Sequence, residues 1–211
     1  MGRNSGGGGG GTPNNQGGLK PDDSTFKGKI GKLESLNTIK NKYVYKAVGE
    51  AISRYHSVMG VRQQNVKLAS LPNGYGGVHV TQNGKSSVVV LSKSIFNGKG
   101  TTTQSVASWS SKGYESGWST KTNKPVAHIV THELAHATWN AHLTKANAKA
   151  ASPAINKVYK SWLKDKSKKG YGEYAKTNVS EFFAETVTKA VHGKSDKYTK
   201  SLKSIVKKYK L

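Results

Sequence analysis

Two histidines stand four residues apart in the stretch THELAHATW (131–139), with a glutamate directly after the first. On a helix, His132 and His136 leave the same face one turn apart, so their imidazoles can bind one zinc ion. Glu133 then lies on the adjoining face, close enough to a zinc-bound water to act as its general base. The pattern predicts a zinc hydrolase, and the alternative is that both histidines are polar residues on a helix surface.

Two further histidines flank this motif. His128 precedes His132 by four residues, but three successive i+4 positions span about 12 Å. That distance is too long for one zinc ion, whose ligands lie at roughly 2.0–2.1 Å. We therefore expect His128 to be structural or to support a ligand, and His142, which is out of register, to lie on the surface.

A third ligand must come from the acidic residues after the motif, which are few in so basic a chain. Glu181 and Glu185 lie four residues apart in NVSEFFAET (178–186). One of them can coordinate zinc while the other accepts a hydrogen bond from a ligating histidine. Two alternatives need no metal: Asn178 and Glu181 form a capping box, and Glu185 occupies the solvent face of the helix.

The two motifs together resemble a known family. HELAH (132–136) followed by YAKTNVSEFFAE (174–185) is similar to the catalytic domain of anthrax lethal factor and its relatives, which are zincins with HExxH and a distant glutamate. The resemblance covers about residues 120–200, with a weaker architectural match back to about residue 35. Ala135 stands where several relatives carry glycine, a small-for-small change that should leave ligation intact.

The resemblance implies a role for each of these residues. His132, His136 and Glu181 would be the zinc ligands. Glu133 would be the catalytic base, and Glu185 would hydrogen-bond a ligating histidine. The implied cofactor is Zn²⁺.

A tyrosine precedes the helix of the third ligand. By the same resemblance, the phenol of Tyr174 hydrogen-bonds the tetrahedral intermediate. This role also makes physical sense, because zinc peptidases need a donor aimed at the developing oxyanion. Tyr171, three residues earlier, is the competing candidate.

Several elements must bring these residues together. Apolar spacing in residues 35–60 predicts an amphipathic helix that ends near Gly60. β-rich runs at 78–81 and 87–91, on either side of an Asn-Gly turn, predict a hairpin. Residues 97–124 are predicted to be loop and short irregular structure.

Zincins commonly bind an extended peptide along an edge strand beside the metal helix. The stretch SVVVLS (87–92) is the best candidate for that strand, and a plain core strand is an equal alternative.

Helices are predicted at 125–143, 145–165 and 179–192, and over a basic segment that ends at Leu211. The expected fold class is α+β: a zincin-like metallopeptidase domain in which a small β-sheet with a hairpin packs against several helices. Among these are the HExxH helix and the downstream glutamate helix.

The composition of the chain limits the possible kinds of site and the domain organisation. The chain of 211 residues has no cysteine, which excludes disulfides and thiolate metal sites. We expect a flexible Gly-rich tail at 1–25 and one domain at 26–211 with a lysine-rich C-terminal helix. The sequence has no apolar run of about 18 residues and no Sec signal peptide, so we expect a soluble protein. Its location is left open: the protein could be cytoplasmic, associated with a virion, or exported by another route.

The net charge of +23 favours anionic partners, and lysines concentrate in the C-terminal half. We expect a zinc-dependent metalloendopeptidase that hydrolyses a peptide or protein substrate, acidic or mixed in charge, with a zinc-bound water activated by Glu133. The alternative is a basic, non-catalytic structural or nucleic-acid-associated protein, for instance phage-borne, with a zincin fold.

Overall fold

The computed structural model describes residues 30–61, 65–82, 86–144 and 149–211. The predicted tail at 1–25 and the centre of the hairpin turn lie outside these ranges.

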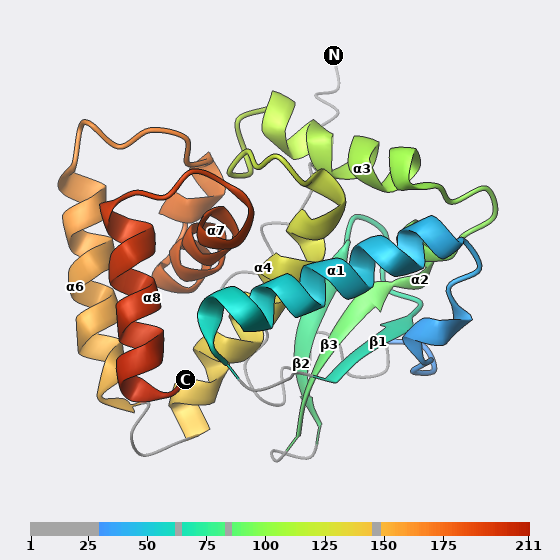
Figure 1. The fold of residues 1–211 in the computed structure, drawn as a ribbon, viewed down its shortest axis with the longest axis horizontal. Coiled ribbons are helices and arrows are strands. Elements are labelled where there is room, and N and C mark those ends of the chain that lie inside the picture. The colour runs from blue at the N-terminus through green and yellow to red at the C-terminus, as the bar shows by residue number, and fades with distance from the viewer. Residues whose placement is uncertain (1–29, 62–64, 83–85, 145–148) are drawn as a thin grey trace.

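A buried helix, α4 (Pro125–Thr144), forms the centre of the molecule (Figure 1). It begins at Pro125, as predicted, because the first helical position needs no N–H donor. Every residue from 127 to 140 is buried, so the helix has neighbours on all sides. These neighbours are α1 (Lys42–Met59), α3 (Thr103–Glu115), α7 (Val179–His192) and the sheet.

The sheet has three strands, β1 (Asn65–Ala69), β2 (Gly77–Gln82) and β3 (Ser86–Ser92), in the order β1-β3-β2. β2 and β3 pair antiparallel, which confirms the hairpin, and β1 pairs parallel to β3. β3 is central, so the prediction of a substrate-binding edge strand at residues 87–92 is wrong and the alternative of a core strand is confirmed. The parallel crossover from β1 leaves no local signal in the sequence that would reveal this order.

The two faces of the sheet have different partners. Leu68, Val89 and Leu91 belong to the main core with α1 and α4, while Val78 and Val90 belong to a smaller cluster on the opposite face. Both sets alternate along their strands, as a pleated sheet requires.

The helix α1 ends as predicted but begins at Lys42, later than the start of the predicted stretch at residue 35. Asn41 caps it by accepting hydrogen bonds from the N–H groups of Tyr43 and Val44. It ends at Gly60, which adopts the left-handed conformation with φ of 67°.

The loop predicted for residues 97–124 is wrong, since α3 occupies much of this stretch. Thr102 and Ser105 form a capping box at its start. Val106 is its only fully buried large apolar residue, so the hydrophobic period is too weak to detect in a sequence rich in serine and threonine. A four-residue helix, α2 (Lys93–Phe96), precedes it.

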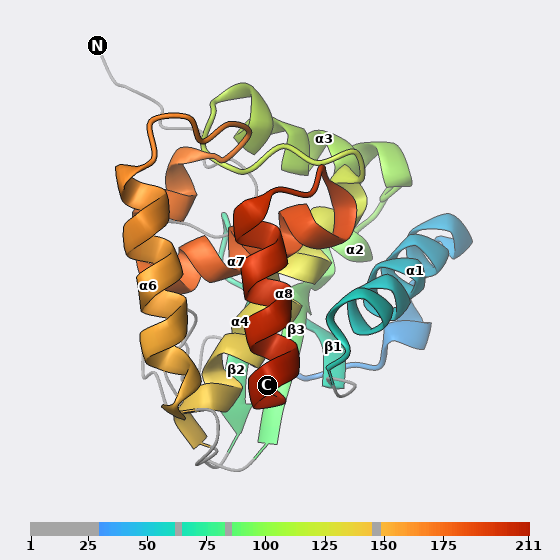
Figure 2. The same ribbon diagram turned by 60° about the vertical axis from the view of Figure 1, so that its left-hand side comes forward.

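In the part of the chain that the structure describes after α4, the α-helices are α6 (Ala151–Lys164), α7 and α8 (Lys197–Tyr209). α6 begins at Ala151, later than predicted, and Pro153 lies in its first turn, where no intrahelical N–H is required. α6 and α8 lie side by side and both pack on α7 (Figures 1 and 2).

The architecture is therefore α+β, as predicted. Within the described ranges, two short 3₁₀ helices, η2 (Leu36–Thr38) and η3 (Glu173–Lys176), join the larger elements. In the described ranges, no helix combines the length and the apolar character that crossing a membrane requires.

Candidate metal centre

Three side chains from α4 and α7 converge on one point in the core. The Nε2 atoms of His132 and His136 lie 3.0 Å apart, and Oε2 of Glu181 lies 3.1 and 3.2 Å from them. All three residues are fully buried. The alternative of polar histidines on a helix surface is therefore wrong.

The spacing of these atoms fits a metal ion. Ligands at roughly 2.0–2.1 Å from a tetrahedral zinc ion lie about 3.3–3.4 Å from one another. The three observed separations are 3.0–3.2 Å, close to that value. Two imidazole nitrogens and one carboxylate oxygen are also a donor set that zinc accepts, so these residues could hold a metal ion.

The start of α7 presents Glu181 to the histidines. Asn178 caps the helix by accepting hydrogen bonds from the N–H groups of Ser180 and Glu181. Of the capping box proposed as the metal-free alternative, the structure shows the Asn178 half, while the carboxylate of Glu181 points to the histidines. The helix N-terminus also stabilises this negative charge.

The other ring nitrogen of each histidine is also engaged. Nδ1 of His132 lies 3.0 Å from Oε1 of Glu185, and Nδ1 of His136 lies 3.2 Å from Oγ of Ser180. A carboxylate can only accept a hydrogen bond, so Nδ1 of a neutral His132 carries the proton. Its Nε2, on the side of Glu181, then has a lone pair, which is what a histidine needs in order to bind a metal ion.

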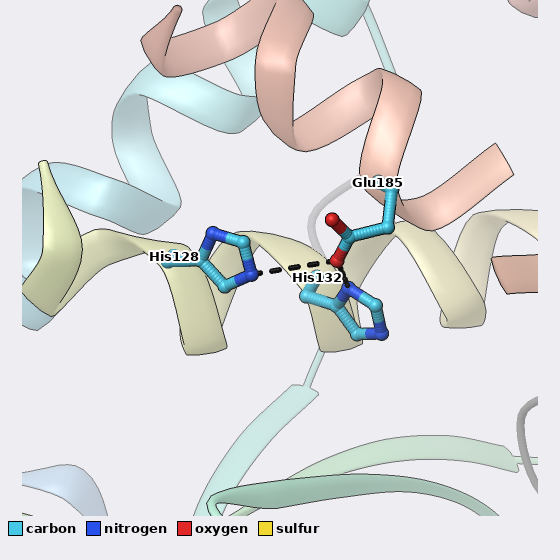
Figure 3. A group of neighbouring side chains, drawn as sticks. All are labelled: His128, His132 and Glu185. Atoms are coloured by element: carbon cyan, nitrogen blue, oxygen red, sulfur yellow. Dashed lines mark ion pairs between the residues drawn. The ribbon is translucent and has the colours of Figure 1, made fainter. Parts of the chain in front are cut away.

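A second group of side chains meets on the Nδ1 side of His132 (Figure 3). The Glu185 carboxylate, from α7, lies between His128 and His132 of α4, and its Oε1 is 3.4 Å from Nε2 of His128. Its other oxygen accepts a hydrogen bond of 2.5 Å from the N–H of Thr120. Glu185 is fully buried, so the alternative that it occupies the solvent face is wrong.

By distance alone, this second group could also hold an ion. A neutral imidazole has one lone pair, however, and His132 directs it to one side only. The HExxH glutamate and the second histidine of the motif belong to the Nε2 side. The group of His132, His136 and Glu181 therefore combines a donor set for a metal ion with the glutamate of the motif, while His128 and Glu185 meet on the other side of His132.

The charges around His132 attract a cation. Burial lowers the pKa of His132, but hydrogen bonds to Glu181 and Glu185 outweigh it and hold the pKa well above its ordinary value. Burial raises the pKa of Glu181, yet His136 and His132 bring it down to about 2. Glu185 likewise has a lowered pKa, because His128 and His132 outweigh its burial. The site thus favours positive charge, from protons or from a metal.

Glu133 lies beside this point, against the sheet. It is fully buried, and neither carboxylate oxygen has a hydrogen-bond partner among the described residues. A Cβ at Gly77 of β2 would come within 2.7 Å of Glu133 Cγ, so only glycine leaves room for this side chain. Burial raises the pKa of Glu133, partly offset by His136 and His132. A carboxylate kept from ordinary partners with a raised pKa suits a general base.

Tyr174 covers the site from η3. Its ring stacks on His132 with centroids 5.7 Å apart, and Trp118 stacks on its other face at 5.1 Å. Burial, with the charges of Glu181 and Glu133, raises the pKa of the phenol well above its usual value. The phenol therefore stays protonated and able to donate. Tyr171 points away, donating to Asp196, so the geometry favours Tyr174 over its competitor.

One segment anchors both Tyr174 and Glu185. The N–H of Tyr174 donates to the carbonyl of Trp118 at 2.9 Å, and the N–H of Gly172 donates to Oγ1 of Thr120 at 3.1 Å. A Cβ at Gly172 would lie 2.2 Å from the Trp118 carbonyl oxygen, so this close approach requires glycine. Thr120 also holds Glu185, so the position of the tyrosine depends on the same backbone as that of the supporting carboxylate.

Besides Trp118 and Gly172, sequence reasoning missed four residues at this centre. They are Gly77, Thr120 and Ser180, with the contacts given above, and His79 of β2, which is buried and close enough to His136 for their charges to interact. Ser180 directly precedes the third ligand, a weak signal. The others come from distant elements and leave no pattern in the sequence. The side chain of His142 lies outside the described part of the chain.

Comparison of the chain with protein-family models, curated proteins and solved structures gives no significant match. Any functional assignment therefore depends on the geometry of this centre.

Proposed function

We propose that this protein is a zinc-dependent metallopeptidase of the zincin kind, resembling the lethal factor catalytic domain. The observation that carries the proposal is the convergence of His132 Nε2, His136 Nε2 and Glu181 Oε2 within 3.2 Å, beside a buried Glu133. The two-histidine, one-carboxylate donor set leaves a coordination position open, as catalytic zinc sites do.

The side chains of this chain can divide the work of amide hydrolysis. A zinc ion held by His132, His136 and Glu181 would lower the pKa of a water molecule and polarise the scissile carbonyl. Glu133 takes a proton from the attacking water and passes it to the leaving amine. Tyr174 donates a hydrogen bond to the oxygen on which negative charge develops.

The strand β2 supports a place for the substrate. It is an edge strand in the described sheet, and its Gly77 touches Glu133. An extended peptide added to this edge would run beside the metal centre, with main-chain hydrogen bonds fixing its register. β2 thus replaces residues 87–92 as the candidate substrate strand.

Metal analysis combined with one substitution tests the proposal. We expect purified protein to bind one equivalent of zinc and to cleave members of a mixed peptide library. Glu133→Gln should keep the zinc and lose about 100- to 10,000-fold in kcat/KM, the usual contribution of a general base. Glu115→Gln is the matched control, because Glu115 is exposed on α3. Unchanged cleavage by Glu133→Gln, or no zinc binding by the wild type, would refute the proposal.

A second candidate is a metal-stabilised protein without hydrolytic activity, basic and associated with nucleic acid or with a structure such as a virion. The complete burial of Glu133 and of all three ligands favours it, because a substrate must reach these atoms. Zinc binding that raises the melting temperature, with no cleavage of any library peptide, would support this candidate over the peptidase.

A further inference from the structure

Two lysine triplets face outward from neighbouring helices. α6 carries Lys157, Lys160 and Lys164, and α8 carries Lys200, Lys203 and Lys207, all of them exposed. Both triplets have the spacing i, i+3, i+7, which aligns three side chains along one side of a helix. We call these six residues the lysine face.

The lysine face points away from the core on both helices. The buried residues of α6 include Ile155 and Trp162, and those of α8 include Leu202 and Val206. On α6 these apolar positions lie opposite the lysines, and on α8 they lie about a third of a turn away from them. α6 and α8 lie side by side on α7 (Figures 1 and 2), so the two triplets lie on the exposed sides of neighbouring helices.

The charges of the lysine face are not neutralised within the part of the chain that the structure describes. Nearby carboxylates have other partners: Asp165 pairs with Lys197 at 2.7 Å and Asp196 pairs with Lys189 at 2.8 Å. Glu173 pairs with Lys176 at 2.6 Å. The remaining two acids of this region, Glu181 and Glu185, are buried at the metal centre.

The dimensions of the lysine face match a nucleic-acid duplex. Seven residues of helix rise about 10 Å, and packed helices lie about 8–10 Å apart. A 10 Å length of duplex carries about six phosphates on its two strands, so a duplex presents several phosphates over the length of either triplet. Six exposed charges fixed on two rigid helices can therefore contact a short length of phosphate backbone.

The side chains of the lysine face indicate which class of partner it fits: a membrane, a protein or a nucleic acid. A helix that lies in a membrane interface needs large apolar residues on its outward side, and Leu163 is the only exposed large hydrophobic residue described on α6 and α8. A protein interface would favour aromatic and arginine anchors, which these triplets lack. The same lack of exposed aromatic side chains removes the stacking platform on which single-stranded bases bind.

We propose that the lysine face binds the phosphate backbone of double-stranded nucleic acid without sequence preference. This binding is separate from the metal centre and does not depend on the peptidase proposal. Purely electrostatic contact of this kind gives a Kd of about 10⁻⁴–10⁻⁶ M at physiological salt.

Fluorescence anisotropy with a labelled 20-base-pair DNA of arbitrary sequence tests the proposal. With six contacts, wild-type affinity should fall about 1,000-fold between 50 and 200 mM salt. The triple variants K157Q/K160Q/K164Q and K200Q/K203Q/K207Q should each bind about 10- to 100-fold more weakly at low salt. Each should also lose about 2.7 from the slope of log K against log salt.

A matched control removes the same charge from elsewhere. Lys42, Lys99 and Lys112 are exposed on α1, on the loop after α2 and on α3. Their triple glutamine variant should bind DNA nearly as well as the wild type. Equal weakening in all three variants would overturn the proposal in favour of a diffuse charge effect. Binding to phosphatidylserine vesicles but not to DNA would overturn it in favour of a membrane.

Discussion

The two nitrogens of the His132 ring face two glutamates of the same helix, in two different surroundings. On the Nε2 side, Glu181 lies 3.1 Å away and is joined by His136. On the Nδ1 side, Glu185 lies 3.0 Å away and is joined by His128. Distance alone makes both groups candidate metal sites.

The difference lies in what completes each group. Glu185 has its second oxygen satisfied by the N–H of Thr120, so backbone holds it as a hydrogen-bond acceptor. On the other side, Glu133 is buried with two oxygens that lack partners among the described residues. A carboxylate tied to backbone suits a positioning role, while a free one beside three converging donors suits chemistry.

The largest expected effect distinguishes the two glutamates directly. Glu181→Gln removes a charged ligand and should weaken zinc binding by about 3–5 kcal/mol, roughly a quarter to a third of the 10–16 kcal/mol typical of protein zinc sites. Glu185→Gln should cost only about 10- to 100-fold. Competition with a chromophoric chelator measures both affinities, and the two variants control for each other because both remove one buried carboxylate. Equal losses in the two variants would contradict the assignment.

A smaller effect tests the position of Glu133. In Gly77→Ala, the new Cβ would lie 2.7 Å from Glu133 Cγ and push the carboxylate aside. Displacement of a catalytic group by about 1 Å can cost about 100-fold in rate, so we expect that loss in kcat with zinc content unchanged. Zinc titration and peptide cleavage, measured on one preparation, separate the two quantities.

Gly49 offers the control for this substitution. It lies on the exposed side of α1, and a Cβ there meets nothing within 4 Å. Gly49→Ala should leave cleavage unchanged and stabilise the protein by about 0.5–1 kcal/mol. A Gly77→Ala variant as active as Gly49→Ala would show that Glu133 does not need its present position.

These residues also show what the sequence could predict. The pairs His132–His136 and Glu181–Glu185 are each four apart on a helix, so their common faces follow from local geometry alone. Asn178 is likewise a local signal, and it caps α7 as proposed.

The rest depends on contacts between distant segments. Glu185 accepts a hydrogen bond from the N–H of Thr120, 65 positions earlier in the chain. Glu133 lies against Gly77, which belongs to a strand, so no helical spacing relates the two residues. The order of the sheet depends on the pairing of β1 with β3, which no short pattern encodes. α3 was missed because its fold depends on a cap and on one buried side chain, Val106.

Two buried histidines outside the converging group, His79 and His192, extend the comparison. Burial lowers the pKa of His79 to about 3 and that of His192 to about 4, in contrast to the raised pKa of His132. Their pKa values in the folded state lie below about 6.5, the value in the unfolded chain. Their contribution to stability is therefore complete above about pH 6.5 and is lost as the pH falls toward 4.

His192→Gln should remove the contribution of His192 to the pH dependence of the free energy of unfolding. Between pH 7 and 4.5, metal-free wild type should lose about 2 kcal/mol more stability than the variant. Urea unfolding at the two pH values, in the presence of a chelator, measures the difference. His56→Gln is a less buried control, and equal pH dependence in the wild type and in His192→Gln would contradict the expectation.

The smallest effect concerns His128, which decides between one ion and two. His128→Phe keeps an aromatic ring in edge-on contact with Tyr114 and removes the imidazole nitrogen that lies 3.4 Å from the Glu185 carboxylate. We expect that His128 only supports Glu185. Because it acts through Glu185 on His132, we expect about a tenfold loss of zinc affinity, at the low end for residues that orient a ligand. Zinc stoichiometry, measured by mass spectrometry of the native protein, should stay at one in both forms. Two ions in the wild type and one in His128→Phe would instead make the Nδ1 side of His132 a second metal position.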